Sequence, residues 1–405
     1  MSKTGVKVDK AGRSSGIDHL RACITVVVVA FHAALGYVTF LIPPVRGTTW
    51  SVPIAPVVDE RRWAGFDLFI TFNNTFFMSL MFFISGLFVV PSLERKGAAA
   101  FLNDRAWRLG VPFLLGILFL SPLAYYPSFI LTGSGQGYPA FWRDMVLIGP
   151  WPPGPLWFIS MLLAFNLLVP PACRLFEWAG FRENPTGGFG TRIRRDPSSF
   201  FLVLMVLTIV AYMPNFSLYG PTYWVTWGAI ANFQASRVLL YLAYFGFGVY
   251  FGARGLSSTF LGDSVRIGNR WWAWAFLAGI SFVWYLGASK AMLEHFSPLD
   301  PWTRPAGWLS TGMSFATTCA TISYACLVIF HRFRIPSSRF LDSLCANAYG
   351  IYLLHYPFVI WTQYSLIDWP LDALAKVAIV FIVALLGSWV LVAFLRRFEV
   401  IGKVI

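Results

Sequence analysis

Polar side chains that could act together in a reaction lie in the first apolar stretch of the chain, GIDHLRACITVVVVAFHAALGY. Asp18, His19 and Arg21 lie near its start, and His32 follows Arg21 by eleven residues. Eleven residues of α-helix span about 16 Å and return to within roughly 20° of the same face. Asp18 precedes Arg21 by three residues, a spacing at which a carboxylate can hold a guanidinium in place. One helix face would therefore present a fixed cation near its start and an imidazole near mid-span.

Arg21 and His32 together favour proton transfer by the imidazole, next to an anionic ligand bound by the guanidinium. The ordinary pKa of histidine, about 6.5, suits a general base at neutral pH. An ionisable residue inside an apolar span costs free energy, so it is by default a candidate functional residue. The structural alternative stays open, with His32 as an interhelical hydrogen-bonding residue and Arg21 as an anchor at the membrane surface.

Two further segments carry residues of the same kinds. FLNDRAWRLGVPF places Arg105 and Arg108 in a loop just before the third apolar run, where loop arginines are by default a feature of membrane orientation. ANAYGIYLLHYPF places His355 at a depth similar to that of His32, either to orient a substrate or to bond a neighbouring helix. Ser85-Gly86 in the second run allows close helix approach. No serine or cysteine is clearly placed as a nucleophile, and Ser85 stays open as one.

The composition defines the elements that must position these residues. The 405 residues are 57% hydrophobic and 12% charged, with 39 Phe and 18 Trp, and the mean hydropathy is +0.63. A water-soluble fold could not bury that much apolar surface. We therefore expect an all-α, polytopic integral membrane protein. It has about ten transmembrane helices, at 17–40, 66–90, 111–131, 154–172, 199–214, 231–252, 271–290, 307–330, 345–366 and 373–395.

The distribution of Lys and Arg predicts the orientation of these helices. If the N-terminus is cytoplasmic, 23 of the 31 basic residues fall on the cytoplasmic side, alternating loop by loop as the positive-inside rule requires. Both termini are then cytoplasmic, with tails at 1–16 and 396–405 flanking a membrane domain at 17–395. The N-terminal apolar run is too long for a signal peptide and is expected to be retained. Residues 180–199, Gly-rich and basic, are the one candidate for local disorder.

The same pattern explains the net charge of +13. Basic loops of a membrane protein account for it, so nucleic acid is not an expected partner. The five cysteines contain no CxxC pair and no metal-like Cys/His spacing, so neither a metal site nor a disulfide is expected.

Taken in order, these segments resemble the acyltransferase 3 family of membrane acyltransferases, which includes glucan-modifying and O-antigen-acetylating members. The resemblance covers nearly the whole chain. Its motifs are Asp18, Arg21 and His32 in the first span, Phe82, Phe83, Ser85 and Gly86 in the second, Arg105 and Arg108 before the third, Pro155, Leu156, Trp157 and Phe158 in the fourth, and Tyr349 to His355 with Pro357 in the ninth.

The resemblance implies transfer of an acyl group, usually acetyl from acetyl-CoA, to a hydroxyl of a carbohydrate, glycolipid or other extracytoplasmic acceptor at the bacterial inner membrane. It implies that Asp18, Arg21, His32, Arg105 and Arg108 are essential. Guanidinium groups suit the phosphates of CoA, and the pantetheine arm is long enough to bring the thioester to His32. His32 would act as general base, with an acyl-imidazole intermediate as the alternative. Acyl-CoA is then a co-substrate, and no tightly bound cofactor is expected.

Further residues could meet the acceptor. Trp157, near the outer interface, could stack on a sugar ring or belong to the aromatic belt. His355 and Tyr352 could orient a substrate. The remaining candidates are polar residues expected in outer halves of spans or outer loops, and each has a structural or solvated alternative: Asn73, Asn74, Asn232, Gln234, Arg237, Glu294, His295 and Asp300.

Two other classes compete with an acyltransferase. A secondary transporter would fit ten spans with polar residues inside them, but the sequence has no repeated half and no relay of carboxylates. A non-catalytic polysaccharide-export partner would leave Arg21 and His32 without a shared purpose. The chain ends about ten residues after the tenth span, so we expect a stand-alone form without the esterase-like domain that some family members append. The sequence leaves the acceptor, the acyl group beyond acetyl, and the oligomeric state open.

Overall fold

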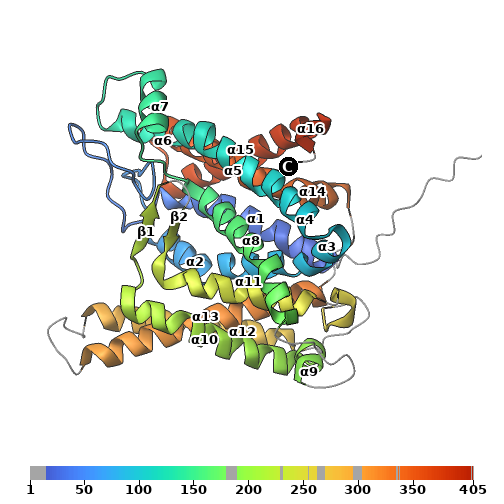
Figure 1. The fold of residues 1–405 in the computed structure, drawn as a ribbon. Helices are drawn as coiled ribbons and strands as arrows, with labels where there is room; N and C mark the ends of the chain where they lie inside the picture. The colour runs from blue at the N-terminus through green and yellow to red at the C-terminus, as the bar shows by residue number, and fades with distance from the viewer. Residues whose placement is uncertain are drawn as a thin grey trace, which may run out of the picture.

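A computed structural model describes residues 15–178, 189–228, 231–253, 255–261, 270–294, 303–333, 336, 338–402 and 404. The described chain is a bundle of long helices with one small β-hairpin (Figure 1). The longer helices are α1 (Ser15–Leu35), α2 (Ala64–Gly86), α8 (Trp157–Trp178), α10 (Pro197–Tyr219), α11 (Val238–Gly252), α12 (Trp271–Glu294), α13 (Thr303–Arg332), α14 (Arg339–Ser365) and α15 (Ala373–Leu395). The shorter ones are α3 (Val89–Lys96), α4 (Ala98–Arg105), α5 (Val111–Leu115), α6 (Ser121–Leu131), α7 (Tyr138–Leu147), α9 (Phe189–Arg195) and α16 (Glu399–Gly402).

Each of the ten expected spans contains a helix, which confirms a polytopic membrane protein. Within the described ranges, eight helical segments are long and apolar enough to cross a membrane. The other two expected spans are α11 and α14. α11 has only 15 residues, and the polar and aromatic residues of the 27-residue α14 lower its hydropathy. The fifth span, expected to be the shortest, is the 23-residue α10.

The third span begins earlier than the sequence indicates. α4, α5 and α6 follow one another through two π-helical turns, η1 (Ala106–Gly110) and η2 (Gly116–Leu120), so that Ala98–Leu131 is one helical segment. The segment expected to be an inner loop is therefore helical. Arg105 ends α4, and Arg108 lies in η1.

Two other expectations about local structure are wrong. The sixth span, expected from residue 231, starts later, because β1 (Trp224–Trp227) and β2 (Ala231–Gln234) form an antiparallel hairpin followed by η4 (Ala235–Arg237). Asn232 and Gln234 therefore lie on a strand. The segment 180–199 is not disordered throughout: residues 179–188 lie outside the described residues, but Phe189–Arg195 forms α9.

Asp196, between α9 and α10, caps the next span. Its carboxylate accepts hydrogen bonds from Ser199 Oγ (2.6 Å) and Ser199 N (2.8 Å), which fixes the start of α10. The same hydrogen bonds, the one from the Ser199 side chain above all, lower the pKa of this exposed carboxyl.

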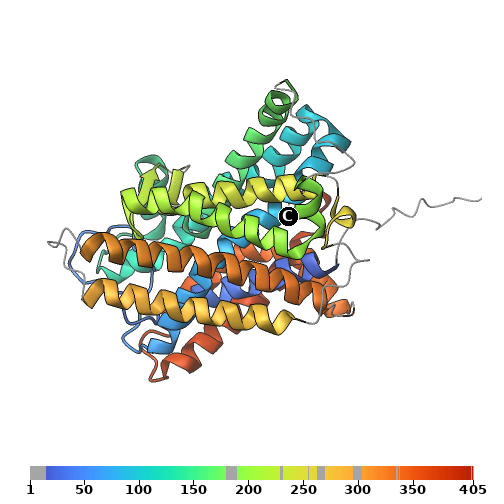
Figure 2. The same cartoon turned by 90° about the horizontal axis from the view of Figure 1, so that it is seen from below.

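The helices pack in two groups around α1, which contacts α2, α13, α14 and α15. α12 and α13 lie side by side along one face of the bundle (Figure 2). α2 and α11 approach closely because glycines face each other: a Cβ on Gly248 would lie 2.1 Å from the Phe83 carbonyl oxygen, and one on Gly86 2.3 Å from that of Phe245. This confirms the close approach expected at Ser85-Gly86.

The bundle has two chemically different ends. We call the end with the start of α1, α3, α4 and α9 the basic end, and the end with the connection 36–63 and the β-hairpin the loop end (Figure 1). That the basic end faces the cytoplasm stays a prediction.

Candidate active site

Two histidines that are 323 residues apart in the sequence meet in the helix bundle. His355 Nε2 of α14 lies 3.2 Å from His32 Nδ1 of α1. His355 is fully buried, whereas His32 is partly exposed. The rings of Phe31 and Tyr356 pack edge-on against His32, with centroids 5.4 and 5.3 Å away. The similar depth expected for the two histidines thus results in direct contact.

The hydrogen bonds assign the protons of this pair. Each Nδ1 contacts a backbone carbonyl, Val28 O for His32 (2.9 Å) and Tyr352 O for His355 (2.7 Å), and a carbonyl only accepts. Both Nδ1 atoms therefore carry the proton in the neutral rings. His355 Nε2 is then an acceptor for the His32 Nδ1–H, and the unprotonated Nε2 of His32 has no hydrogen-bond partner in the described chain. His32 Nε2 is therefore the basic atom of the site that is free to accept a proton.

α14 connects this pair to the basic end through a row of side chains three residues apart. The Tyr352 hydroxyl donates to Pro155 O in η3 (Gly154–Leu156), just before α8. The Tyr349 hydroxyl donates to Arg108 O in η1. Spacing of three residues keeps Tyr349, Tyr352 and His355 on one side of the helix. One helix therefore positions His32, the start of α8 and the segment that carries the two arginines.

The start of α1 has the geometry that its sequence predicts. Arg21 Nη2 lies 3.2 Å from Asp18 Oδ1, and the Arg21 side chain stays 35% exposed. Cys345 of α14 contacts Asp18 O through its thiol (3.6 Å). Since His32 and His355 also meet, α1 and α14 run parallel, with Arg21 toward the basic end and His32 toward the loop end.

His32 lies close to the end of α1 that faces the loop end. Only Ala33 and Ala34 separate it from Leu35, where α1 ends. The amide of Gln363 on α14 donates to His32 O (3.1 Å) and Ala33 O (3.0 Å), so it holds the last turn of α1. The first span was expected to reach residue 40, but its helix ends at Leu35, and the depth of His32 in the membrane stays a prediction.

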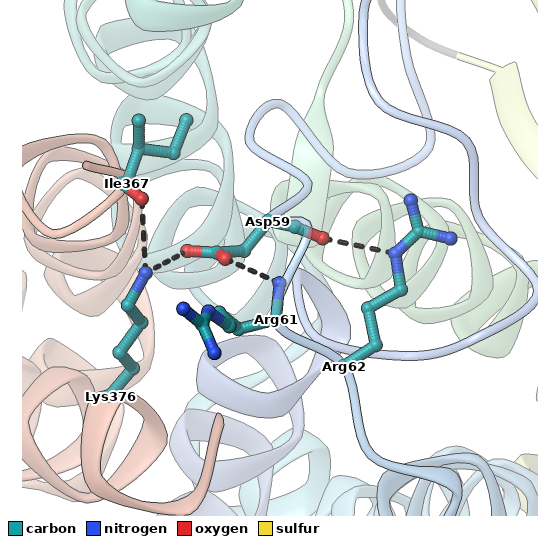
Figure 3. A network of polar contacts seen from close by, with 5 residues as sticks. All are labelled: Asp59, Arg61, Arg62, Ile367 and Lys376. Atoms are coloured by element: carbon teal, nitrogen blue, oxygen red, sulfur yellow. Dashed lines mark hydrogen bonds and ion pairs between the residues drawn. The ribbon is translucent and has the colours of Figure 1, made fainter. Parts of the chain in front are cut away.

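A buried ion pair fastens the connection 36–63 over this end of α1. Lys376 Nζ of α15 donates to Asp59 Oδ2 (2.6 Å) and to Ile367 O (3.0 Å), and the two charged side chains are 0% and 3% exposed (Figure 3). Asp59 also accepts from Arg61 N (2.8 Å), and its carbonyl accepts from Arg62 Nε (3.0 Å). Asp59 N donates to Gly36 O (2.9 Å), which ties the network to α1.

Arg105 and Arg108 lie at the basic end in different surroundings. The Arg105 guanidinium carbon is 4.9 Å from the Phe101 ring centroid, and its Nε is buried without a hydrogen-bond partner. The Arg108 side chain is exposed. Asp104 pairs with Lys96 (2.8 Å). Both guanidinium groups thus keep donors free for an anion.

The remaining candidates are not brought to the histidine pair. Asn73 is buried and donates to Phe69 O of its own helix (2.8 Å). Ser85 is partly buried in α2, next to Gly86. Trp157 packs on Tyr241 with ring centroids 5.6 Å apart. Glu294 lies at the exposed end of α12, 3.8 Å from Lys290. His295 and Asp300 lie outside the described residues.

Sequence reasoning missed Gln363, Tyr356 and the Asp59–Lys376 pair. Lys376 carried a usable signal, since it is a lone cation inside a span of mean hydropathy 2.8. The described residues contain no group of three or more His, Cys, Asp or Glu side chains that could hold a metal ion.

The fold and this site define a multi-pass membrane protein with a histidine pair inside its helix bundle and arginines at one end. The family profile described as an acyltransferase domain, that of the acyltransferase 3 family, matches residues 14–393. The chain therefore belongs to this family and is an O-acyltransferase. Neither the curated proteins nor the solved structures contain a match to it.

Proposed function

We propose that this acyltransferase moves an acyl group, acetyl in the simplest case, from acyl-CoA to a hydroxyl of a carbohydrate or glycolipid, with His32 as the general base. The observation that carries the proposal is Nε2 of the partly exposed His32, which has no hydrogen-bond partner among the described residues, while Nδ1 of the same ring contacts His355. Family membership sets aside the transporter and export-partner alternatives.

The donor site is at the basic end. Arg21, Arg105 and Arg108 supply guanidinium forks for the 3′-phosphate and diphosphate of CoA, since such forks match phosphate oxygens. The buried, unpartnered Nε of Arg105 supports this role, because a bound phosphate would satisfy it. Arg21 and His32 are eleven residues apart, about 16 Å along α1. The extended pantetheine arm covers a distance of this order.

The reaction follows from the proton assignment. The acceptor hydroxyl gives its proton to His32 Nε2 while its oxygen attacks the thioester carbonyl carbon. The carbon–sulfur bond then breaks, and the proton passes from His32 to the CoA sulfur. While His32 is cationic, its Nδ1–H still donates to His355 Nε2 and Val28 O, which stabilises the charge. Water can replace the acceptor in a slow hydrolysis. Formation of an acyl-imidazole at the same Nε2 is the alternative route.

The sidedness follows from the charge distribution. With the basic end in the cytoplasm, acyl-CoA binds from the compartment that contains it, and the acceptor reaches His32 from the loop end. The proposed location of the enzyme is therefore the cytoplasmic membrane of a bacterium, and its proposed acceptor is extracytoplasmic.

Donor binding tests the proposal. Purified protein in nanodiscs is titrated with acetyl-CoA, comparing the wild type with Arg105→Gln/Arg108→Gln and with Arg95→Gln, an exposed arginine at the same end. We expect the double variant to bind about ten- to a hundredfold more weakly, because hydrogen bonds to charged groups are lost, and Arg95→Gln to bind like the wild type. Equal affinity in all three proteins would contradict the donor site.

A further inference from the structure

A second buried guanidinium lies away from the histidine pair, at the loop end. Arg237, in η4 between the hairpin and α11, is 7% exposed. Its Nη1 donates to Asn74 O (2.8 Å) and Asn74 Oδ1 (2.9 Å) of α2, and its Cζ lies 4.8 Å from the Phe315 ring centroid of α13. Its Nε is buried and has no hydrogen-bond partner.

This cation has no carboxylate partner in the described part of the chain. All ion pairs of the described residues involve other side chains. Burial of a charge is costly unless it is paired, and a ring face, one asparagine and the Tyr241 side chain compensate for it only in part. A merely structural link from η4 to α2 would need only the Nη1 donors. The unused Nε edge of the guanidinium is the part that pairs with oxyanions.

Aromatic rings connect Arg237 to the reactive histidines. Its charge interacts with Tyr241, one turn along α11. Tyr241 packs on Trp157, which meets Trp224 of β1 edge-on at 6.2 Å between ring centroids. Next to Trp157, Phe158 packs on Tyr352 at 5.9 Å, and Tyr352 precedes His355 by one turn.

A second route leads to His32 along α2. Asn74, which binds Arg237, precedes Phe77 by three residues, about 4.5 Å of helix rise. The Phe77 ring packs on that of Phe31 with centroids 5.1 Å apart, and Phe31 is next to His32 in α1. Arg237 therefore lies about one helical turn beyond the level of His32, toward the loop end. A sugar-sized molecule can bridge such a separation.

We propose that Arg237 binds a carboxylate or phosphate group of the acceptor, so that the acceptor is an anionic carbohydrate whose ring lies by Trp157 and Trp224. Aromatic side chains suit the apolar faces of sugar rings, and Arg237 supplies the fork for the anion. The inference rests on the proposed function, since it assigns the acceptor of that reaction. Arg237 is a binding residue for the acceptor and takes no part in proton transfer.

Ligand-induced thermal stabilisation tests the inference in nanodiscs at constant ionic strength. The probes are methyl β-D-glucuronide, the neutral methyl β-D-glucoside, glucose 1-phosphate, inorganic sulfate, CoA, acetyl-CoA and succinyl-CoA. The proteins are the wild type, Arg237→Gln, Arg237→Lys and Arg105→Gln/Arg108→Gln. The last variant is the matched control, because it removes guanidinium groups at the opposite end.

We expect the glucuronide or the sugar phosphate, but not the glucoside, to stabilise the wild type saturably. Arg237→Gln should weaken this effect about ten- to a hundredfold and leave stabilisation by CoA unchanged. Arg237→Lys should show an intermediate loss, and the double variant should lose CoA only. If the double variant keeps wild-type CoA binding, the donor site is refuted and this inference is not affected.

Three results would overturn it. Equal stabilisation of the wild type by the glucuronide and the glucoside would overturn the inference, and this test does not require the Arg237 variants to fold. Stabilisation by sulfate equal to that by the anionic sugars would show that only an adventitious ion binds. A preference for succinyl-CoA over acetyl-CoA that is lost in Arg237→Gln, without any effect of the glucuronide, would assign the carboxylate to the donor.

Discussion

Removal of the buried lysine should destabilise the loop end strongly. In Lys376→Met, Asp59 keeps the hydrogen bond from Arg61 N but loses the one cation that pairs with it in the described part of the chain, at a site where it is 3% exposed. Breaking a buried pair by removing one partner costs about 3–5 kcal/mol, because the other charge stays buried. We therefore expect the melting temperature in detergent to fall by about 5 °C or more.

The double variant separates this charge effect from the loss of packing. Asp59→Asn/Lys376→Met leaves no buried charge and keeps an acceptor for Arg61 N, so we expect it to recover at least half of the lost stability. The assay is thermal unfolding followed by tryptophan fluorescence. Arg143→Gln is the matched control, because the Arg143–Asp144 pair has a similar distance of 2.8 Å but is exposed, and its loss should not be measurable. The single variant Asp59→Asn is measured in the same assay. The reasoning is refuted if the double variant loses as much stability as Asp59→Asn and Lys376→Met lose together.

Two further predictions concern α14 and the α2–α11 contact. His355→Leu should lower kcat about 10- to 100-fold with little change in KM for acyl-CoA. His355→Gln should keep part of the wild-type kcat, because its amide oxygen can accept the His32 Nδ1–H. An equal loss of kcat in both variants would indicate that His355 has a packing role only. Gly248→Ala should lower the free energy of unfolding by about 2 kcal/mol or more in a thermal unfolding assay, because its Cβ would lie 2.1 Å from Phe83 O. Gly246→Ala should be tolerated, because the space around that position is open. Equal effects of the two substitutions would contradict the close approach of α2 and α11.

The parts of the site that lie on one helix could be predicted from the sequence. Asp18 and Arg21 pair as their spacing requires, because helix geometry fixes neighbours three residues apart. Runs of apolar residues predicted a helix in each of the ten expected spans, although the third and the sixth start at other residues. The similar level of His32 and His355 was also predictable, and their rings meet.

The contacts between distant segments could not be predicted in this way. Asp59 and Lys376 are 317 residues apart, and nothing in either segment specifies the other as its partner. The strand Ala231–Gln234 was predicted to be the start of the sixth span, because four residues beside a long apolar run do not distinguish a strand from a helix. The helical course of α4 through η1 was missed, since its charged residues are typical of a loop. The Arg237 environment combines side chains from α2, α11 and α13.

The most direct test of the account is turnover by a protein with an intact donor site. Purified wild type, His32→Ala and His32→Gln are given acetyl-CoA in nanodiscs, and both acetyl-CoA affinity and the release of free CoA are measured. We predict wild-type affinity in all three proteins, with release of CoA, by transfer or slow hydrolysis, reduced at least about a hundredfold in both variants. CoA release at the wild-type rate by a folded His32→Ala protein would contradict the assignment of His32 as the catalytic base.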